Sequence, residues 1–194
     1  MGLSWNLAAF GALALWAAGV SGTSAALSLK GEGRPSAPWV HIVAAVLLIA
    51  GAVAAVFGMQ RPDRIFNLLG NPAAAITQQV YAAIALACAL AAWAVIRIRL
   101  GSEQRWLSVV ELVLAAVLVV AVGRRFLIPS APLLNTWLQL LAGIGFAAAA
   151  GALTVLALDT VSQRSDQKAQ GSRACIAACA AMWFLMPATW CSSR

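Results

Sequence analysis

The sequence predicts an all-α membrane protein, a polytopic bundle of about six transmembrane helices with both termini outside. The first observation is composition: 62% of the 194 residues are hydrophobic and only 10% are charged. A soluble domain carries about 25% charged residues to solvate its surface. The second observation is that several apolar runs reach the roughly 20 residues that a helix needs to cross a bilayer. We therefore expect residues 1–194 to form a single integral membrane domain.

Six apolar runs account for this composition. The first is expected to be a retained helix rather than a cleaved signal peptide, because Met1 to Asn6 contains no Lys or Arg and the run is too long. The sixth is the shortest and contains Pro187, which a helix tolerates near a membrane surface. The predicted crossings are residues 5–29, 39–59, 75–96, 107–128, 137–158 and 174–190.

Tryptophans mark the ends of these predicted helices. An indole ring has an apolar body and a polar N–H group, so it settles at the level of the lipid headgroups. We interpret five of the eight tryptophans as membrane anchors: Trp5, Trp39, Trp106, Trp137 and Trp190. Trp16, Trp93 and Trp183 fall inside apolar runs and are interpreted as packing residues.

Basic residues predict the orientation, because cytoplasmic loops gather Lys and Arg. With the amino terminus outside, the inner loops hold Lys30, Arg34, Arg97, Arg99, Arg105, Arg164, Lys168 and Arg173. The outer side then holds Arg61, Arg64, Arg124, Arg125 and Arg194. The excess on the first side favours an outside amino terminus, and six crossings return the carboxyl terminus to the same side. The net charge of +7 is spread over both faces, which indicates membrane orientation and lipid contact rather than nucleic-acid binding.

The single histidine, His41, bears on cofactors. A haem held between two imidazoles needs two histidines, so no haem is expected. We interpret His41 as an interfacial residue bonded to water or lipid. Glu111 is predicted at the same depth in the fourth crossing, where an ionisable group is costly. It is expected to pair with His41 or with Arg105, and lining a proton path is the less favoured alternative.

The positions of the cysteines in the sequence do not predict a metal site. Cys175 and Cys179 are four residues apart and share one helix face, but no His, Asp or Glu joins them in that run. We expect them and Cys88 to be small packing residues, since free cysteine behaves as a small hydrophobe. Cys191 is expected at the outer surface. No zinc or iron–sulfur motif is present, and no metal is predicted.

Two further features concern packing. Arg124 and Arg125 follow a long apolar run, and adjacent residues point about 100° apart on a helix. At least one of them is therefore expected to face the bundle or a partner protein. Small residues in the first, third and fifth crossings, such as Gly19, Gly22 and Gly151, let helix backbones approach closely in lipid. These residues predict a compact bundle.

The loop between the second and third crossings is unusually polar. Residues 60–72 contain two arginines, an aromatic residue, two asparagines and two prolines. An ordinary connection between two membrane helices does not need this density of hydrogen-bonding groups. The loop therefore predicts a docking surface or part of a small-molecule site.

The same loop carries a resemblance to a known family. Arg61-Pro62-Asp63-Arg64-Ile65-Phe66-Asn67, followed by Gly70-Asn71-Pro72 and Ile76-Thr77-Gln78-Gln79, resembles the membrane-anchor subunit of dimethyl sulfoxide reductases. That family has a Pro-x-Arg-x-(aromatic or aliphatic)-Asn loop between its second and third helices. A second block agrees in order, with Arg125, Thr136-Trp137 and Gly145-Phe146. In helix order the resemblance covers Met1 to Leu158.

The resemblance implies a function. Such anchors hold a molybdopterin catalytic subunit and an iron–sulfur subunit against the outer face of a bacterial plasma membrane. They oxidise menaquinol and pass its electrons to the iron–sulfur protein without haem of their own. Carried over to this chain, the implied quinol-binding residues are Arg64, Asn67, Gln78, Gln79 and Tyr81. The implied partner-docking residues are Arg61, Arg64, Phe66, Asn67, Asn71, Arg124 and Arg125.

The chain also departs from that family. The family usually has a histidine where this chain has Gly58, tends to have a glutamate at Gln79, and commonly has eight helices. An amide cannot take up a proton at neutral pH, so anchoring is better supported than quinol oxidation. Two alternatives stay open: a small transporter, and a structural or assembly membrane protein without a redox role. A membrane enzyme with catalytic residues of its own is the least expected, given one histidine and six acidic residues.

Overall fold

The computed structural model describes residues 5–31, 37–57, 70–100, 104–124 and 137–162. Within these ranges the protein is all-helical, and five helices are long and apolar enough to cross a membrane. They are α1 (Trp5–Leu29), α2 (Ala37–Phe57), α4 (Ala75–Leu100), α5 (Arg105–Arg124) and α6 (Trp137–Ser162). The prediction of an all-α, multi-pass membrane bundle is confirmed. The predicted sixth crossing, residues 174–190, lies outside the described residues.

The helix bounds differ from the predicted ones mainly at polar ends. The observed α1 has the predicted bounds, whereas α4 continues through Arg97 and Arg99, which were predicted to lie in a loop. Arginine is a good helix former, and a cation in the last turn is attracted by the negative end of the helix dipole. The prediction, which followed the apolar run alone, therefore placed the end of α4 about one turn too early.

Local hydrogen bonds define two of the helix ends. After α1 the chain turns at Gly31, whose φ of 81° lies in the left-handed region that glycine adopts without steric cost. Before α4, the Ala74 N–H donates to the Asn71 carbonyl at 3.2 Å, and the Gln78 N–H donates to the Ala74 carbonyl at 3.1 Å. The turn at Asn71 thus leads directly into the helix.

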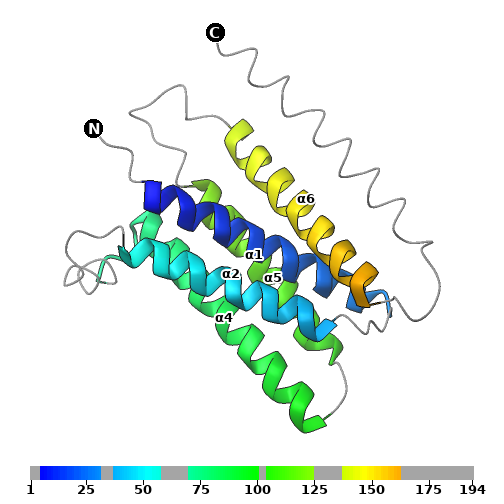
Figure 1. Ribbon diagram of the computed structural model, residues 1–194. Coiled ribbons are helices and arrows are strands. Elements are labelled where there is room, and N and C mark those ends of the chain that lie inside the picture. Colours follow the sequence, from blue (N-terminus) through cyan, green and yellow to red (C-terminus); the bar gives the residue numbers. More distant parts are fainter. Residues whose placement is uncertain (1–4, 32–36, 58–69, 101–103, 125–136, 163–194) are drawn as a thin grey trace.

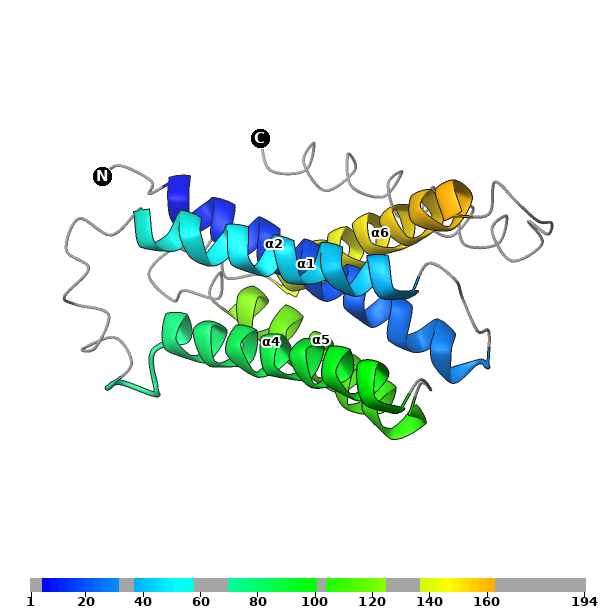
Figure 2. The same ribbon diagram turned by 60° about the horizontal axis from the view of Figure 1, so that its bottom comes forward.

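The helices run alternately up and down, and α1 lies at the centre of the bundle (Figure 1). It packs against α2, α5 and α6, whereas α4 packs mainly along α5. Figure 2 shows α4 and α5 side by side on one side of the bundle and α2 beside α1 on the other. The bundle is therefore two helix pairs that meet at the α1–α5 contact, with α6 packed on α1 and, to a smaller extent, on α5.

Glycines allow the closest helix contact. A Cβ atom added at Gly19 of α1 would overlap the backbone of Ala147 in α6, and one added at Gly151 would overlap the backbone of Gly19. Without a hydrophobic driving force between helices in lipid, close backbone approach supplies the van der Waals contact that holds them. The predicted role of small residues in helix packing is confirmed here. Beside this crossing, the Trp16 Nε1–H donates to the Thr154 hydroxyl at 2.9 Å.

The outer faces of the helices are apolar. On α2, four residues at helical spacing are more than 45% exposed: Ile42, Val46, Ile49 and Val53. Such a continuous apolar stripe fits contact with lipid rather than water. Trp39, Trp106 and Trp137 are each more than half exposed at helix ends, as expected for headgroup anchors. The side chain of Trp5 and all of Trp190 lie outside the described residues.

Candidate functional site

The alternating helix directions give the bundle two different ends. The end of α1, the end of α4 and the start of α5 share one end, which we call the basic end because it carries Lys30, Arg97, Arg99 and Arg105. The opposite end carries the start of α4 and the end of α5 (to the left in Figure 2). Polar side chains gather at both ends, in two separate arrangements.

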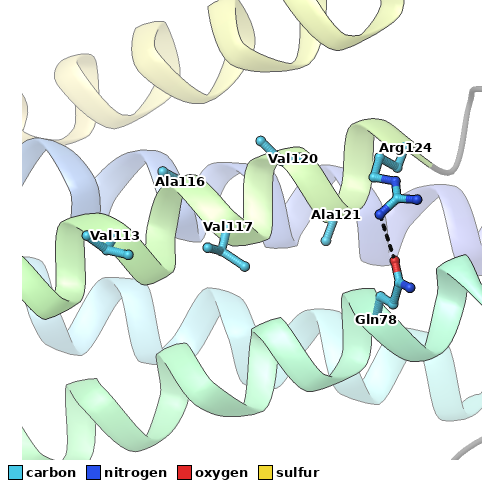
Figure 3. A pocket seen from close by; sticks show the side chains of 7 residues that line it. All are labelled: Gln78, Val113, Ala116, Val117, Val120, Ala121 and Arg124. Atoms are coloured by element: carbon cyan, nitrogen blue, oxygen red, sulfur yellow. Dashed lines mark hydrogen bonds between the residues drawn. The ribbon is translucent and has the colours of Figure 1, made fainter. Parts of the chain in front are cut away.

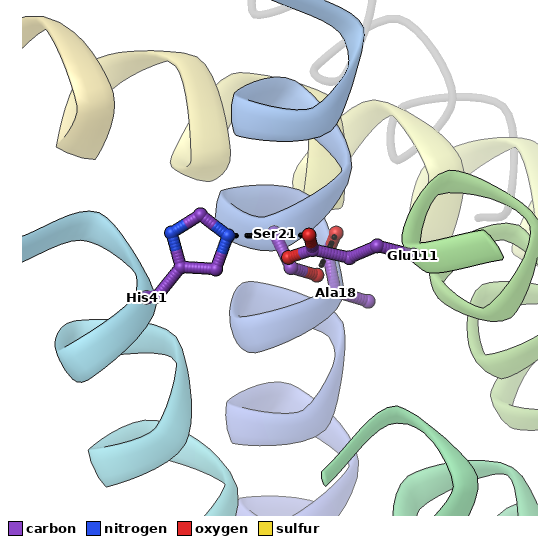
Figure 4. A network of polar contacts seen from close by, with 4 residues as sticks. All are labelled: Ala18, Ser21, His41 and Glu111. Carbon is purple, nitrogen blue, oxygen red and sulfur yellow. Dashed lines mark hydrogen bonds and ion pairs between the residues drawn. The ribbon is translucent and has the colours of Figure 1, made fainter. Parts of the chain in front are cut away.

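The first arrangement joins His41 of α2 to Glu111 of α5. The imidazole Nε2 and the carboxylate Oε2 are 3.2 Å apart, and the two side chains are 6% and 2% exposed. Figure 4 shows the two side chains pointing toward each other past α1. The interpretation of His41 as an interfacial residue bonded to water or lipid is wrong, because the ring is buried against other helices. The predicted pairing of Glu111 is confirmed, with His41 as the partner.

Two residues of α4 complete this group. The indole of Trp93 stacks on the His41 ring, with centroids 3.6 Å apart and an interplanar angle of 5°. The Arg97 guanidinium lies over the Trp93 ring, with its carbon 5.0 Å from the ring centroid. We call His41, Trp93, Arg97 and Glu111 the His41 cluster. It contains a cation–π contact, an aromatic stack and a buried acid–base contact from three helices.

One oxygen in the His41 cluster is unsatisfied. Among the described residues, Glu111 Oε1 is buried without a hydrogen-bond partner. A small residue brings α1 close at this level, since a Cβ atom at Gly22 would lie 3.4 Å from Ala115 and 3.9 Å from Leu112. The nearby Ser21 hydroxyl donates to the Ala18 carbonyl at 3.2 Å instead (Figure 4). The carboxylate thus has one oxygen engaged and one open.

The second arrangement is an apolar groove between α4 and α5 with a polar mouth. Its volume is about 530 Å³, and it is lined by Gln78, Val113, Ala116, Val117, Val120, Ala121 and Arg124. At the mouth, Arg124 Nη1 donates to Gln78 Oε1 at 3.4 Å, as Figure 3 shows. Gln78 Nε2 also donates to the Pro72 carbonyl at 3.4 Å. Gln78 therefore connects the end of the polar loop, α4 and α5.

The predicted quinol-binding residues point in different directions. Gln78 lines the groove, whereas its neighbour Gln79 is 0% exposed and faces the interior of the bundle. Successive residues on a helix are about 100° apart, and here the two amides face different surroundings. Both amide atoms of Gln79 lack a hydrogen-bond partner in the described part of the chain. Tyr81 is 43% exposed on the outer surface. Arg64 and Asn67 lie outside the described residues.

The predicted docking residues are described only in part. Asn71 and Arg124 are exposed, and both lie at the opposite end of the bundle. Their shared position is compatible with one surface at that end. Arg61, Arg64, Phe66, Asn67 and Arg125 lie outside the described residues. Of the predicted arginine pair, Arg124 contacts the bundle through Gln78.

Of the four cysteines, Cys88 is the one that lies in the described part of the chain. Cys88 is a free cysteine with an exposed side chain, so its predicted role as a packing residue is wrong. The residue lies on the outer face of α4, away from the described helices that pack on it. Cys175, Cys179 and Cys191 lie outside the described residues. Within the described ranges, no three His, Cys, Asp or Glu side chains gather in a way that could hold a metal ion.

Sequence reasoning placed His41 and Glu111 at one depth but missed Trp93 and Arg97 as their neighbours. The available signal was spacing, because Trp93 and Arg97 are four residues apart and share a helix face. Nothing in the sequence indicated that this face points toward α2. Comparison with protein-family models, curated proteins and solved structures finds no match to this chain.

Proposed function

We propose that the chain is the membrane-anchor subunit of a molybdopterin oxidoreductase complex of the dimethyl sulfoxide reductase kind, and that it binds menaquinol in the groove between α4 and α5. The proposal rests on the sequence resemblance of residues 61–79 and on one structural observation. That observation is the mouth of the groove, where Gln78 bonds both to Pro72 and to Arg124.

The size and chemistry of the groove support a quinol ligand. Its volume of about 530 Å³ is within the range of small-molecule sites, roughly 300–1,000 Å³. Its walls are valine and alanine side chains, which suit an isoprenoid tail. Val113, Val117 and Val120 are 44–53% exposed, so the groove opens sideways toward lipid. A long tail could therefore leave the protein without having to bend back.

The polar mouth supplies partners for the quinol hydroxyl groups. The Gln78 amide has both a donor and an acceptor, and the Arg124 guanidinium has only donors. Oxidation of menaquinol to menaquinone releases two electrons and two protons. Neither Gln78 nor Arg124 takes up a proton at neutral pH. The protons would therefore pass to water at the opposite end of the bundle, where Arg124 is exposed.

The electrons would pass to partner proteins. In this proposal an iron–sulfur subunit docks on the loop from Arg61 to Asn71, together with Arg124 and Arg125, and delivers electrons to a molybdopterin subunit. Under the predicted orientation this surface faces the outside of a bacterial plasma membrane. The exposure of Asn71 and Arg124 at one end supports a shared docking surface.

Ligand binding tests the quinol site. The full chain in lipid nanodiscs would be titrated with a short-tailed menaquinone analogue, and quenching of tryptophan fluorescence would be measured. We expect Gln78→Ala to weaken binding at least tenfold by removing polar contacts, and Val117→Trp to do so by filling the groove. Gln139→Ala is the control, since Gln139 is exposed at the same end on α6. Wild-type affinity in both groove variants would remove the groove as the quinol site.

Copurification tests the anchor role separately. After mild detergent extraction, the wild-type chain should bring down an iron–sulfur protein and a molybdenum enzyme. We expect the double change of Arg61 and Arg64 to Ala to release both partners while the helices still insert. Isolation of the wild-type chain without either partner would contradict the anchor role even if the groove binds the quinone analogue.

A further inference from the structure

The His41 cluster is too far from the groove mouth to take part in the proposed quinol chemistry. Glu111 and Arg124 are separated by 13 positions on α5, which corresponds to about 20 Å along the helix. We propose that His41 and Glu111 form a proton-binding site within the membrane that exchanges protons with water at the basic end. This proposal does not depend on the quinol function.

The geometry allows direct proton transfer between the two groups. His41 Nε2 and Glu111 Oε2 are 3.2 Å apart, which is close to hydrogen-bond distance. When the site holds a proton between these atoms, the proton can reside on Nε2 as an imidazolium facing a carboxylate. It can instead reside on Oε2 as a carboxylic acid facing a neutral imidazole. The transfer breaks one N–H bond, forms one O–H bond and needs no other reactant.

Burial determines how many protons the pair should hold. Both side chains are more than nine-tenths buried. Without a proton the pair would have a net charge of −1, and with two protons it would have +1. A single proton makes the pair neutral in either arrangement. Because burying a net charge is costly, the neutral state with one proton is the one this environment favours.

The open oxygen of Glu111 distinguishes this pair from a purely structural contact. A buried carboxylate that only fastens two helices is expected to have both oxygens satisfied. In the described part of the chain, Glu111 Oε1 has no partner although the residue is only 1% exposed. This oxygen can accept a hydrogen bond from an entering water molecule, which is the step that brings a proton to the site or removes one.

The pair lies close to the basic end of the bundle. His41 is four residues from the start of α2, and Glu111 is six residues from the start of α5. At 1.5 Å per residue these depths are about 6 and 9 Å. A proton therefore has to cross only one to two helical turns to reach water at this end. The rest of α5 is apolar as far as Arg124, which gives no comparable route to the opposite end.

Other charged groups at this end act more weakly on the pair. Arg97 of α4 lies over the Trp93 ring, which in turn stacks on His41. The remaining ionisable groups on elements that share this end are Lys30 of α1, Arg99 of α4, Arg105 of α5 and Asp159 of α6. Lys30, Arg99 and Arg105 are exposed, so water and salt screen their charges. The contact between His41 and Glu111 is buried, so it is screened less than the charges of these exposed residues.

The site also joins the two helix pairs of the bundle. Because α2 packs mainly on α1, and α4 mainly on α5, His41 links α2 to both members of the second pair. It does so through Trp93 of α4 and Glu111 of α5. Loss of the proton would leave a buried carboxylate facing a neutral ring. Proton occupancy should therefore change how firmly α2 is held at the basic end.

Nuclear magnetic resonance can test the proposal directly, because His41 is the only histidine in the chain. The full chain, labelled with ¹⁵N-histidine, would be placed in lipid nanodiscs and titrated from pH 4 to pH 9. We expect the ring nitrogen signals to change reversibly between protonated and unprotonated forms. Signals that stay constant over this range would show that the site is sealed, and the proposal would be wrong. This measurement needs no variant.

Variants test the role of Glu111. Glu111→Gln preserves the shape and can still hydrogen-bond to His41, but it carries no negative charge. We expect it to change the pH response of the His41 ring signals, because the imidazole then faces a neutral amide that cannot exchange a proton with it. Ser108→Ala is the control, since Ser108 is a buried polar residue one turn earlier on α5, and it should titrate like the wild type. Unchanged titration in Glu111→Gln would exclude Glu111 from the site.

Discussion

The two ends of α5 carry ionisable residues in opposite environments. Glu111 is 1% exposed and meets His41, while Arg124 is exposed and donates a hydrogen bond to Gln78. A long arginine side chain at a helix end can extend toward water and headgroups. A short carboxylate two turns inside the helix has to find its partner within the protein. The difference shows that position along a membrane helix decides whether a charge is satisfied by solvent or by packing.

The comparison predicts large effects of substitutions in the His41 cluster and small ones at the groove mouth. The largest is expected for Trp93→Ala, which removes the stack on His41 and leaves a cavity. We expect a loss of about 3 kcal/mol in the free energy of unfolding, at the low end of the range for buried aromatic residues. The low end applies because the indole is also in lipid when the helices separate. Unfolding in mixed detergent micelles measures it.

Trp106→Ala is the matched control for that change. Trp106 is 57% exposed at the start of α5, so its removal should cost little stability. Equal losses of stability for the two substitutions would mean that the contacts of Trp93 in the His41 cluster do not stabilise the fold.

The next largest effect is expected for Glu111→Ala. The contact between His41 and Glu111 would be lost while His41 stays buried, and removing a hydrogen-bond partner from a buried polar group costs about 1–3 kcal/mol. A double-mutant cycle with His41→Ala should give a coupling energy of about 0.6–1.7 kcal/mol, the range found between average and strongest hydrogen bonds in membrane helices. A coupling energy of zero would show that the two side chains are neighbours without an energetic interaction.

A smaller effect is expected for Arg97→Ala. Removing the guanidinium from the Trp93 ring should cost about 0.5–1 kcal/mol, the value for cation–π contacts at accessible sites. Arg99→Ala gives the comparison, because Arg99 is two residues away and exposed. The same unfolding measurement applies. A larger loss of stability for Arg99→Ala than for Arg97→Ala would contradict a stabilising cation–π contact between Arg97 and Trp93.

The smallest effect on stability is expected for Arg124→Ala. An exposed polar contact of 3.4 Å contributes little, so the loss should be below about 0.5 kcal/mol. The same substitution should weaken binding of the menaquinone analogue several-fold. A large loss of stability with unchanged binding of the analogue would contradict this proposal, because Arg124 would then stabilise the fold and not contribute to the quinol site.

Much of the fold could be predicted because the low content of charged residues and the length of the apolar runs directly indicate membrane-spanning helices. The bounds of α1 agree with the prediction, and the other described helices differ by a few residues at their polar ends. The candidate sites were less accessible to sequence reasoning. His41 and Glu111 could be placed at one depth, but which helices are neighbours depends on packing. Cys88 was misplaced for the same reason, since an apolar helix does not reveal from its sequence which face meets lipid.

The sequence by itself determined that this chain crosses the membrane several times, roughly where its helices lie, and where small residues permit close approach. Those properties follow from hydrophobicity and backbone geometry along one segment at a time. Only the tertiary structure decided that Trp93 covers His41, that Glu111 keeps one oxygen open, and that Gln78 and Gln79 face different surroundings. These contacts depend on the rotation of each helix about its own axis. In lipid that rotation is set by side-chain packing between helices, because every helix here is apolar on almost all sides.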